Sequence, residues 1–290
     1  MSRTLWQVRG RALALDHRPL VMGIVNVTPD SFSDGGDFFA PDAAVAHGSR
    51  LLAEGADILD VGGQSTRPQG ATAVSTEEEL QRVLPVITAL AAAHPDAILS
   101  VDTVNAEVAA GAIEAGAHIV NDVSGVRLDP AMASLCAKAG VGVVVMHSRG
   151  GVSDMATYEH ADYGGDFLAT MLAELRDRVG AVERAGVRSD AIAVDPGIGF
   201  AKRPEHSLRA LACLRRLVDW DYAVLVGASR KRFIGQLTGE SRPAQRVFGS
   251  VGAAVAAYER GASLLRVHDV APTRAALDVA AAIRNAGAAS

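Results

Sequence analysis

The sequence predicts an α/β protein, a single-domain (β/α)8 barrel of the TIM type that is preceded by a short N-terminal hairpin. Eight short apolar runs alternate with longer helical patterns rich in Ala, Leu and Val. The runs are nearly continuously apolar, as in parallel strands whose outer face is covered by helices. The length of 290 residues, 49% of them hydrophobic, suits eight β–α units around one large core.

The eight predicted strands recur along the whole chain. They are residues 20–26, 57–62, 97–102, 118–122, 141–147, 191–195, 222–227 and 263–268. A doubly wound α/β sheet is the main alternative, but it usually has fewer strands and a glycine-rich phosphate turn after the first one. Here the first strand runs into NVTPDSFSDGG (26–36), which does not match G-x-G-x-x-G. The barrel is therefore favoured.

Helix signals lie between these strands. Residues 75–93 open with Ser75 and Glu78 in the spacing of a capping box, and residues 105–116 end on Gly116 at a plausible C′ position. Residues 166–186 form a long amphipathic pattern, and residues 5–16 predict a small hairpin at the bottom of the barrel. Because no linker or composition shift is visible, we expect one domain over 1–290, with the hairpin in 1–18 and the barrel in 19–285.

Composition excludes several classes of partner. The net charge is −5 and the pI is about 5.9, so the chain has no overall basic field of the kind that nucleic-acid binders show. No stretch approaches the ~20 apolar residues of a membrane span, and the N-terminus lacks the apolar region of a signal peptide. Cys136 and Cys213 are widely separated, which favours core thiols over a disulfide or zinc site. We expect a cytoplasmic protein that binds neither nucleic acid nor a membrane.

Polar residues stand at the end of nearly every predicted strand. In a (β/α)8 barrel these ends meet at one rim, where enzymes of this fold have their active sites. Buried polar groups need partners, so a ring of them predicts a bound ligand. The stretch GASRKRFIG (227–235) adds three cations and predicts an anionic ligand. The ring comprises Asn26, Asp60, Asp102, Asn121, Asp122, His147, Asp195, Ser229, Arg230, Lys231, Arg266 and His268.

Eight motifs, taken in order, resemble those of the dihydropteroate synthases, a family of pterin-binding barrels. They are MGIVNVTPDSFSDGG (22–36), DVGGQSTRP (60–68), SVDT (100–103), IVNDVSG (119–125), VMH (145–147), DPGIGFAK (195–202), GASRKRFIG (227–235) and RVHDV (266–270). The resemblance implies a transferase of folate biosynthesis that joins 6-hydroxymethyl-7,8-dihydropterin diphosphate to p-aminobenzoate, giving 7,8-dihydropteroate and pyrophosphate. It also implies Mg²⁺ as cofactor and a homodimer.

The same resemblance implies roles for individual residues. The pterin pocket would contain Asp102, Asn121, Met146, Asp195, Phe200 and Lys231. Asn26 would bind Mg²⁺, and the pyrophosphate site would contain Asn26, Arg266 and His268. The p-aminobenzoate site would contain Phe32, Thr66, Arg67, Pro68 and Arg232. Two residues keep a second interpretation, since Met146 also fits plain core packing and Arg232 also fits a solvated position.

The implied reaction is an SN1-like substitution. Asp102 and Asp34 would offset the positive charge that develops on the pterin methylene, and Lys231 would complete the catalytic set. No protein nucleophile is required, and Ser65, Ser229 and His147 form no triad motif. We expect Asp60 to hold a loop in place without touching a ligand.

The sequence contains two long loops rich in Gly and Ser, at 28–36 and 62–70, and departures from the family pattern lie in the second. Gln64 stands where the family more often has Glu, and Gln69 resembles a one-residue insertion, which leaves sensitivity or resistance to sulfonamides undecided. Two alternatives remain: a pterin-binding methyltransferase barrel and a non-catalytic pterin-binding relative. The cations at 229–231 and 266–268, with the two long loops, favour the synthase because a methyl donor releases no diphosphate.

Overall fold

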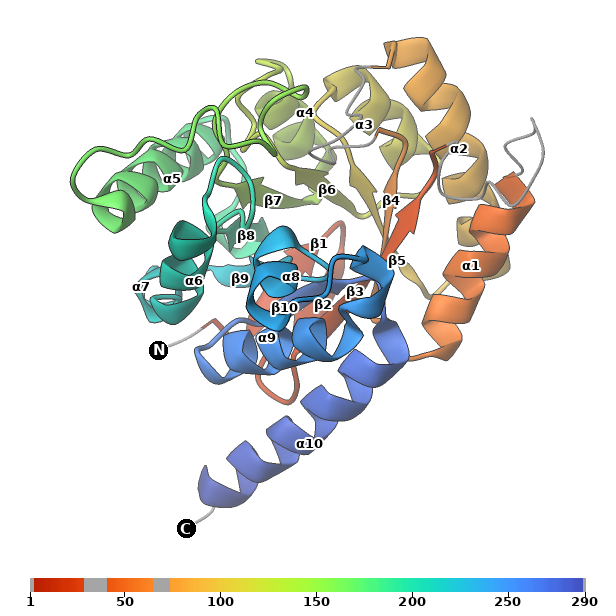
Figure 1. Cartoon of the computed structure of the whole chain (residues 1–290). Helices are drawn as coiled ribbons and strands as arrows, with labels where there is room; N and C mark the ends of the chain where they lie inside the picture. Colours follow the sequence, from red (N-terminus) through yellow and green to blue (C-terminus); the bar gives the residue numbers. More distant parts are fainter. Residues whose placement is uncertain (1–2, 29–40, 65–73, 289–290) are drawn as a thin grey trace.

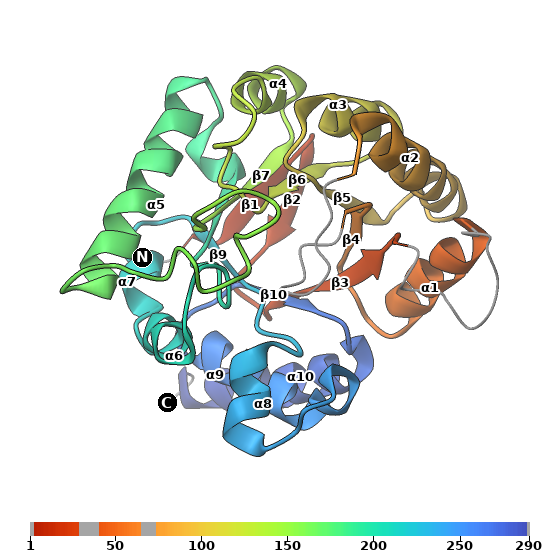
Figure 2. The ribbon, with the colours of Figure 1, turned by 45° about the horizontal axis from the view of Figure 1, so that its top comes forward.

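The computed structural model describes residues 3–28, 41–64 and 74–288, and within them eight parallel strands close into a barrel (Figures 1 and 2). The order around the barrel is β10-β3-β4-β5-β6-β7-β8-β9. The strands are β3 (Leu20–Asn26), β4 (Ile58–Gly62), β5 (Ile98–Asp102), β6 (Ile119–Asp122), β7 (Gly142–Met146), β8 (Ile192–Asp195), β9 (Ala223–Val226) and β10 (Leu264–Val267). The predicted fold and all eight strands are confirmed.

Helices surround this barrel (Figure 2). The described helices are α1 (Pro41–Ala53), α2 (Thr76–Ala93), α3 (Ala106–Glu114), α4 (Met132–Ala139), α5 (Phe167–Arg184), α6 (Pro204–Ala212), α7 (Arg215–Val218), α8 (Arg232–Thr238), α9 (Val247–Glu259) and α10 (Val270–Ala288), with the 3-10 turns η2 (Ser189–Ala191) and η3 (Pro243–Gln245). None of the helices in the described ranges is both long and apolar enough to span a membrane.

The predicted helix ends are confirmed where local chemistry specifies them. The Ser75 hydroxyl accepts the backbone N–H of Glu78 at 3.1 Å, which caps α2. Glu78 itself pairs with Arg82 one turn on. Gly116 follows Ala115, the C-cap of α3, with φ of 120°, a conformation that favours glycine.

The inward face of the strands changes from apolar to polar along the barrel axis. At the bottom, the inward side chains form one buried cluster with residues such as Met22, Ile58 and Ile119. Because side chains alternate along a strand, Asp60 and Asn121, two positions further on, point inward as well. The outward residues pack in a separate cluster against the helices. The strands thus end in a polar layer inside the barrel.

The N-terminal hairpin closes the bottom of the barrel, as predicted. It consists of β1 (Leu5–Val8) and β2 (Arg11–Ala14). Trp6 and Val8 are fully buried in the same cluster as the inward strand residues. The Trp6 indole Nε1–H donates to the Ala191 carbonyl at 2.9 Å, and Arg9 donates to the Ala117 carbonyl at 2.9 Å. The hairpin therefore serves as an apolar plug opposite the polar end.

Replacing Trp6 with Ala should lower the free energy of unfolding by about 3–5 kcal/mol, because it removes a fully buried aromatic side chain. Urea denaturation measures the loss. Leu5→Ala on the same strand, where 45% of the side chain is exposed, is the control and should cost under about 0.5 kcal/mol. Equal losses for the two variants would contradict the plug.

Candidate active site

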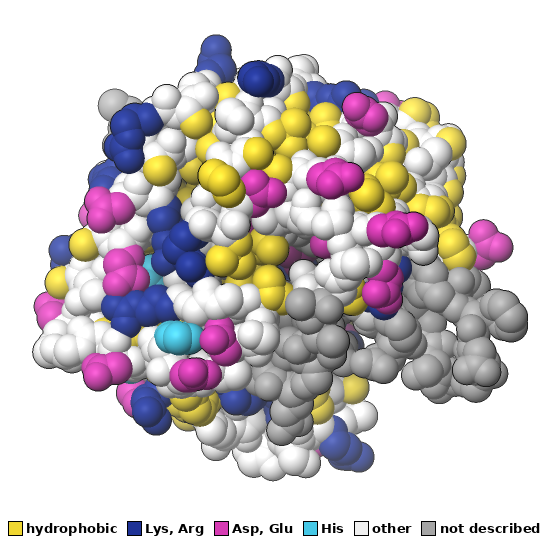
Figure 3. Space-filling model, turned by 90° about the horizontal axis from the view of Figure 1, so that it is seen from above, with side chains coloured by type: hydrophobic (Ala, Val, Ile, Leu, Met, Phe, Trp, Pro, Cys, Tyr) yellow, Lys and Arg dark blue, Asp and Glu magenta, His cyan; other side chains and the backbone are white. Residues whose placement is uncertain are grey.

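Arg266 links the polar groups at the open end of the barrel. Its Nε–H donates to Asp60 Oδ2 at 2.6 Å, and its Nη2 donates to Asp102 Oδ2 at 2.7 Å. The amide of Asn121 donates to the same Asp60 oxygen at 2.9 Å. Figure 3, which views the molecule from above, shows a recess near the centre of this face. Four strands, β4, β5, β6 and β10, therefore share one hydrogen-bonded layer.

Burial makes the charges of this layer costly. It raises the pKa of Asp102 to about 7, with Asp60 adding to the rise and Arg266 opposing it. For Arg266, burial disfavours the cation, but the attraction of Asp60 and Asp102 outweighs it and raises the pKa. Asp60 has no exposed surface and is bonded to both Arg266 and Asn121. Asp60 thus holds two side chains inside the barrel, whereas the sequence predicted that it would hold a loop.

Lys231 and Asp195 form a second charged group beside this layer. Burial lowers the pKa of Lys231 to about 7, while the nearby Asp195 carboxylate acts in the opposite direction. The Lys231 ammonium donates to the Ile198 carbonyl and lies 4.2 Å from the centre of the Phe200 ring. Burial also raises the pKa of Asp195, whose Oδ1 accepts the Gly197 N–H at 2.6 Å.

The loop after β8 can approach these groups because it contains glycine at two close contacts. Gly197 has φ of 68°, and a Cβ there would lie 1.9 Å from the His147 carbonyl oxygen. Gly199 has φ of 78°, and a Cβ there would lie 2.9 Å from the Lys231 side chain. Both backbone conformations favour glycine. The glycines of DPGIGFAK thus let the loop lie directly against β7 and Lys231.

The structure also brings together the apolar candidates. Met146 is 3% exposed and packs in a small cluster with Val123 and Met155, against which Phe200 also packs. This cluster lies at the ends of β6 and β7 and in the loops that follow. The packing of Met146 agrees with its interpretation as a core residue, and its expected role in the pterin pocket stays a prediction. Met155 was not expected from the sequence.

The neighbouring cations of GASRKRFIG point to different partners. Arg230 pairs with Asp269 through two bonds of 3.0 and 2.5 Å, and its backbone N–H donates to Ser250. Ser229 Oγ lies 3.1 Å from His268 Nδ1 and accepts the His268 backbone N–H at 3.2 Å. Ser229 and Arg230 therefore fix the turn that brings β9 and β10 together.

Arg232 is held by a loop that the sequence reading did not consider. Its Nη2 donates to the Ala156 carbonyl at 2.8 Å, and its guanidinium lies 4.3 Å from the centre of the Tyr158 ring. Both partners belong to the segment between β7 and α5. The 18-residue gap between the predicted strand 141–147 and helix 166–186 was the available signal for a functional loop.

Two polar strand ends do not join the ring expected from the sequence. His147 is fully buried and its Nε2 bonds Glu174 on α5 at 2.9 Å. Asp122 accepts the backbone N–H and the hydroxyl of Ser124 at 2.7 and 2.6 Å. Both follow an inward residue by one position, so their side chains leave the barrel on its outer side.

Asn26 ends β3 in register with Gly62, which in turn pairs with Asp102. A Cβ on Gly62 would lie 3.3 Å from the Asp102 Cβ, so the glycine keeps the space between Asn26 and Asp102 open. The Asn26 amide has no protein hydrogen-bond partner within the described ranges and is available to a ligand. The remaining predicted site residues lie outside the described residues: Phe32, Asp34, Thr66, Arg67 and Pro68.

Comparisons with known proteins agree with this arrangement. A family model described as pterin binding enzyme matches residues 22–268. The dihydropteroate synthase of Mycobacterium leprae (strain TN) is 46% identical over 273 residues, which cover 92% of this chain and 94% of the relative. The structure of Xanthomonas albilineans dihydropteroate synthase with 4-aminobenzoic acid matches with a TM-score of 0.90 at 49% identity, over 98% of this chain and 99% of that one. The enzyme of the same organism in complex with 7,8-dihydropteroate matches with a TM-score of 0.86 at 47% identity, over 97% and 98% of the chains.

Asp102→Asn should alter how stability depends on pH. The folded protein holds the Asp102 proton up to pH about 7, whereas the unfolded chain releases it near the ordinary aspartate pKa of 3.8. Between these values the folded state binds more protons, so this group destabilises the wild type as pH rises. The stability of the variant relative to wild type should therefore increase from pH 5 to pH 8, by at most about 1.4 kcal/mol per pH unit. Urea denaturation at both pH values measures the difference.

Asp190→Asn provides the control for that slope, because the hydrogen bond from Arg188 lowers the pKa of Asp190. A lowered carboxyl pKa contributes stability that is lost only as pH falls below the usual range, so this difference should be flat from pH 5 to pH 8. A flat difference for Asp102→Asn as well would contradict the raised pKa.

Proposed function

The chain belongs to the family of pterin-binding enzymes, and we propose that the polar end of its barrel is the active site of a dihydropteroate synthase. This transferase of folate synthesis joins 6-hydroxymethyl-7,8-dihydropterin diphosphate to p-aminobenzoate and releases pyrophosphate. The observation that carries the proposal is the Arg266-centred layer of Asp60, Asp102 and Asn121 beside Lys231 and Asp195. It combines a cationic site for a leaving anion with acceptors and donors for a flat polar ring.

The pterin is the ligand that these acceptors and donors suit. The ring edge of a reduced pterin alternates N–H donors with acceptors, so Asp102 and Asp195 accept from it while the Lys231 ammonium donates. Met146 and Phe200 offer apolar surface to the ring faces. A ligand lacking one of these polar groups leaves a buried charge unpaired, which gives the site its specificity.

In this proposal, groups at the end of β10 stabilise the leaving group. The Arg266 guanidinium has five N–H donors, of which two bond Asp60 and Asp102, so others can bond phosphate oxygens. His268 follows β10 and adds a ring nitrogen. In this mechanism, departure of pyrophosphate leaves positive charge on the pterin methylene, and the Asp102 carboxylate offsets that charge. The arylamine of p-aminobenzoate then attacks, so the substitution is SN1-like and needs no protein nucleophile.

Mg²⁺ is the cofactor that the donor set fits. The Asn26 amide oxygen is a hard ligand on a half-buried residue at the end of β3, in register with Gly62. Mg²⁺ usually takes one or two protein oxygens and completes its shell with phosphate oxygens and water, so one amide beside the anion site suffices. When bound, the ion neutralises charge on the departing diphosphate.

A homodimer formed through α6, α8 and α9 is the second part of the proposal. These helices enclose a hollow of about 470 Å³ on the outside of the barrel. Its walls are almost entirely apolar, with Leu208, Phe233, Leu237 and Ala253 among them, which suits a protein partner better than the charged substrates. Phe248, on the same α9, is 90% exposed.

Two free cysteines support the cytoplasm as the compartment, because thiols stay reduced there.

Purified protein should form 7,8-dihydropteroate from the diphosphate pterin and p-aminobenzoate, and removal of Mg²⁺ with a chelator should abolish pyrophosphate release. Liquid chromatography of the pteroate and a coupled assay of pyrophosphate measure the two products. Sulfamethoxazole added to the same assay establishes whether the chain with Gln64 and Gln69 is inhibited. Tight pterin binding without product would favour the methyltransferase or the non-catalytic relative.

Leu237→Glu should convert the dimer into a monomer, because it buries a charge in an apolar interface. The substitution should weaken association about 30-fold or more, which corresponds to about 2 kcal/mol. Light scattering after size-exclusion chromatography measures the mass over a concentration series. Leu128→Glu, before α4 and away from the hollow, is the matched control and should leave the dimer intact. A wild-type monomer at micromolar concentration would contradict the proposal.

A further inference from the structure

Lys202 is a fully buried cation behind the wall of the pterin pocket. It is 1% exposed, and its Nζ lies 2.7 Å from His147 Nδ1, 3.3 Å from the His147 carbonyl and 3.1 Å from the Phe200 carbonyl. Burial lowers the pKa of Lys202, but these three acceptors match the three N–H groups of an ammonium. One side chain thus ties together the loops that follow β7 and β8.

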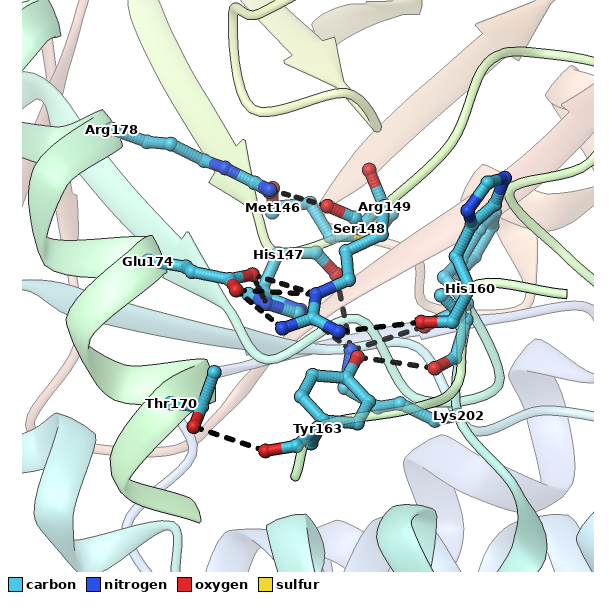
Figure 4. Close-up of polar contacts among 12 residues, drawn as sticks. Met146, His147, Ser148, Arg149, His160, Tyr163, Thr170, Glu174, Arg178 and Lys202 are labelled. Atoms are coloured by element: carbon cyan, nitrogen blue, oxygen red, sulfur yellow. Dashed lines mark hydrogen bonds and ion pairs between the residues drawn. The ribbon is translucent and has the colours of Figure 1, made fainter. Parts of the chain in front are cut away.

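The same bonds continue through His147 to α5 (Figure 4). Burial, with Lys202 beside it, lowers the pKa of His147 to about 3, so the imidazole is neutral. Its Nδ1 accepts from Lys202, which assigns the proton to Nε2, and Nε2–H donates to Glu174 at 2.9 Å. Glu174 also accepts from Arg149 at 2.5 Å. Each of these hydrogen bonds therefore pairs a donor with an acceptor.

The segment that Lys202 holds is both strained and close to the ligand site. Ala201 has φ of 47°, in the left-handed region that non-glycine residues seldom adopt. Its N–H donates to Met155 at 2.6 Å and its carbonyl accepts from the Tyr163 hydroxyl at 3.1 Å. One residue earlier, the Phe200 ring lies against the Lys231 ammonium. A strained backbone keeps such a conformation only when its surroundings fix it.

We propose that Lys202 is a positioning residue for pterin binding, which acts by fixing the carbonyls of His147 and Phe200 and, through them, the position of the Phe200 ring beside Lys231. The inference rests on the proposed function, because it assumes that Phe200 and Lys231 contact the pterin. Lys202 itself touches no reacting atom. Substitution of Lys202 should therefore change the KM for the pterin substrate and leave the KM for p-aminobenzoate nearly unchanged.

A matched pair of substitutions tests this. Lys202→Met and Lys202→Gln have the same side-chain length, but only Gln retains N–H donors for the two carbonyls. In Lys202→Met the KM for the diphosphate pterin should rise at least tenfold, with the KM for p-aminobenzoate within twofold of wild type. Lys202→Gln should show a smaller rise in the first KM. Steady-state kinetics for each substrate, with calorimetric titration of the pterin, give these values.

Arg274→Met is the control for general destabilisation. Arg274 is a buried cation at the other end of the barrel, where it pairs with Asp57 and donates to the Pro19 carbonyl. The Arg274→Met substitution should lower the melting temperature without changing the KM for either substrate. Lys202→Met with both KM values unchanged, or equal effects of Met and Gln, would overturn the positioning role. If Lys202→Met fails to fold, the KM for the diphosphate pterin in Lys202→Gln, compared with that in Arg274→Met, decides the question. A wild-type protein without activity would count against the proposed function instead.

Discussion

The bridge that Arg266 forms between Asp60 and Asp102 is the interaction on which the rest of the site depends. Two carboxylates inside one barrel repel each other and are both desolvated, so neither stays ionised at low cost unless a cation lies between them. The bridge joins β10 to β4 and β5, strands that meet only because the barrel closes. Its geometry is therefore a property of the closed fold and cannot form in an isolated fragment of the chain.

The barrel separates stability from function along its axis. At the bottom, the hairpin and the inward apolar side chains pack without polar atoms, and the Trp6 indole is satisfied by Ala191. At the top, the same inward positions carry groups whose pKa values are displaced by burial, in Asp102 upward and in Lys231 downward. Each pKa shift shows that burial disfavours the charged form of the side chain. A ligand of matching charge can offset that cost. Burial of apolar side chains at the bottom stabilises the fold and offsets the cost of burying charged groups at the top.

The sequence predicted those parts of the molecule that depend on local pattern. Strand ends could be read because an apolar run stops at a polar residue, and this located Asp102, Asn121, Asp195 and Arg266. The pattern did not show on which face a terminal residue lies. Because side chains alternate along a strand, a residue one position beyond an inward residue points outward, as His147 and Asp122 do. The segment between β7 and α5 has no hydrophobic periodicity. Its contacts with Arg232 and Phe200 join residues distant in sequence, so the sequence pattern did not reveal them. Asp34 and residues 65–70 of the second loop lie outside the described residues, so their expected roles stay predictions.

The three adjacent cations at 230–232 illustrate how backbone geometry assigns different tasks to similar residues. Arg230 has φ of 59°, a left-handed conformation that reverses the chain between β9 and α8 and directs this side chain outward to Asp269. Lys231 has returned to an extended conformation, which turns its side chain toward Phe200 and the ligand site. Arg232 begins α8, and its side chain reaches the loop after β7. A chain of net negative charge can therefore place one cation in the pocket, because the other two are used in holding the pocket's edges in place.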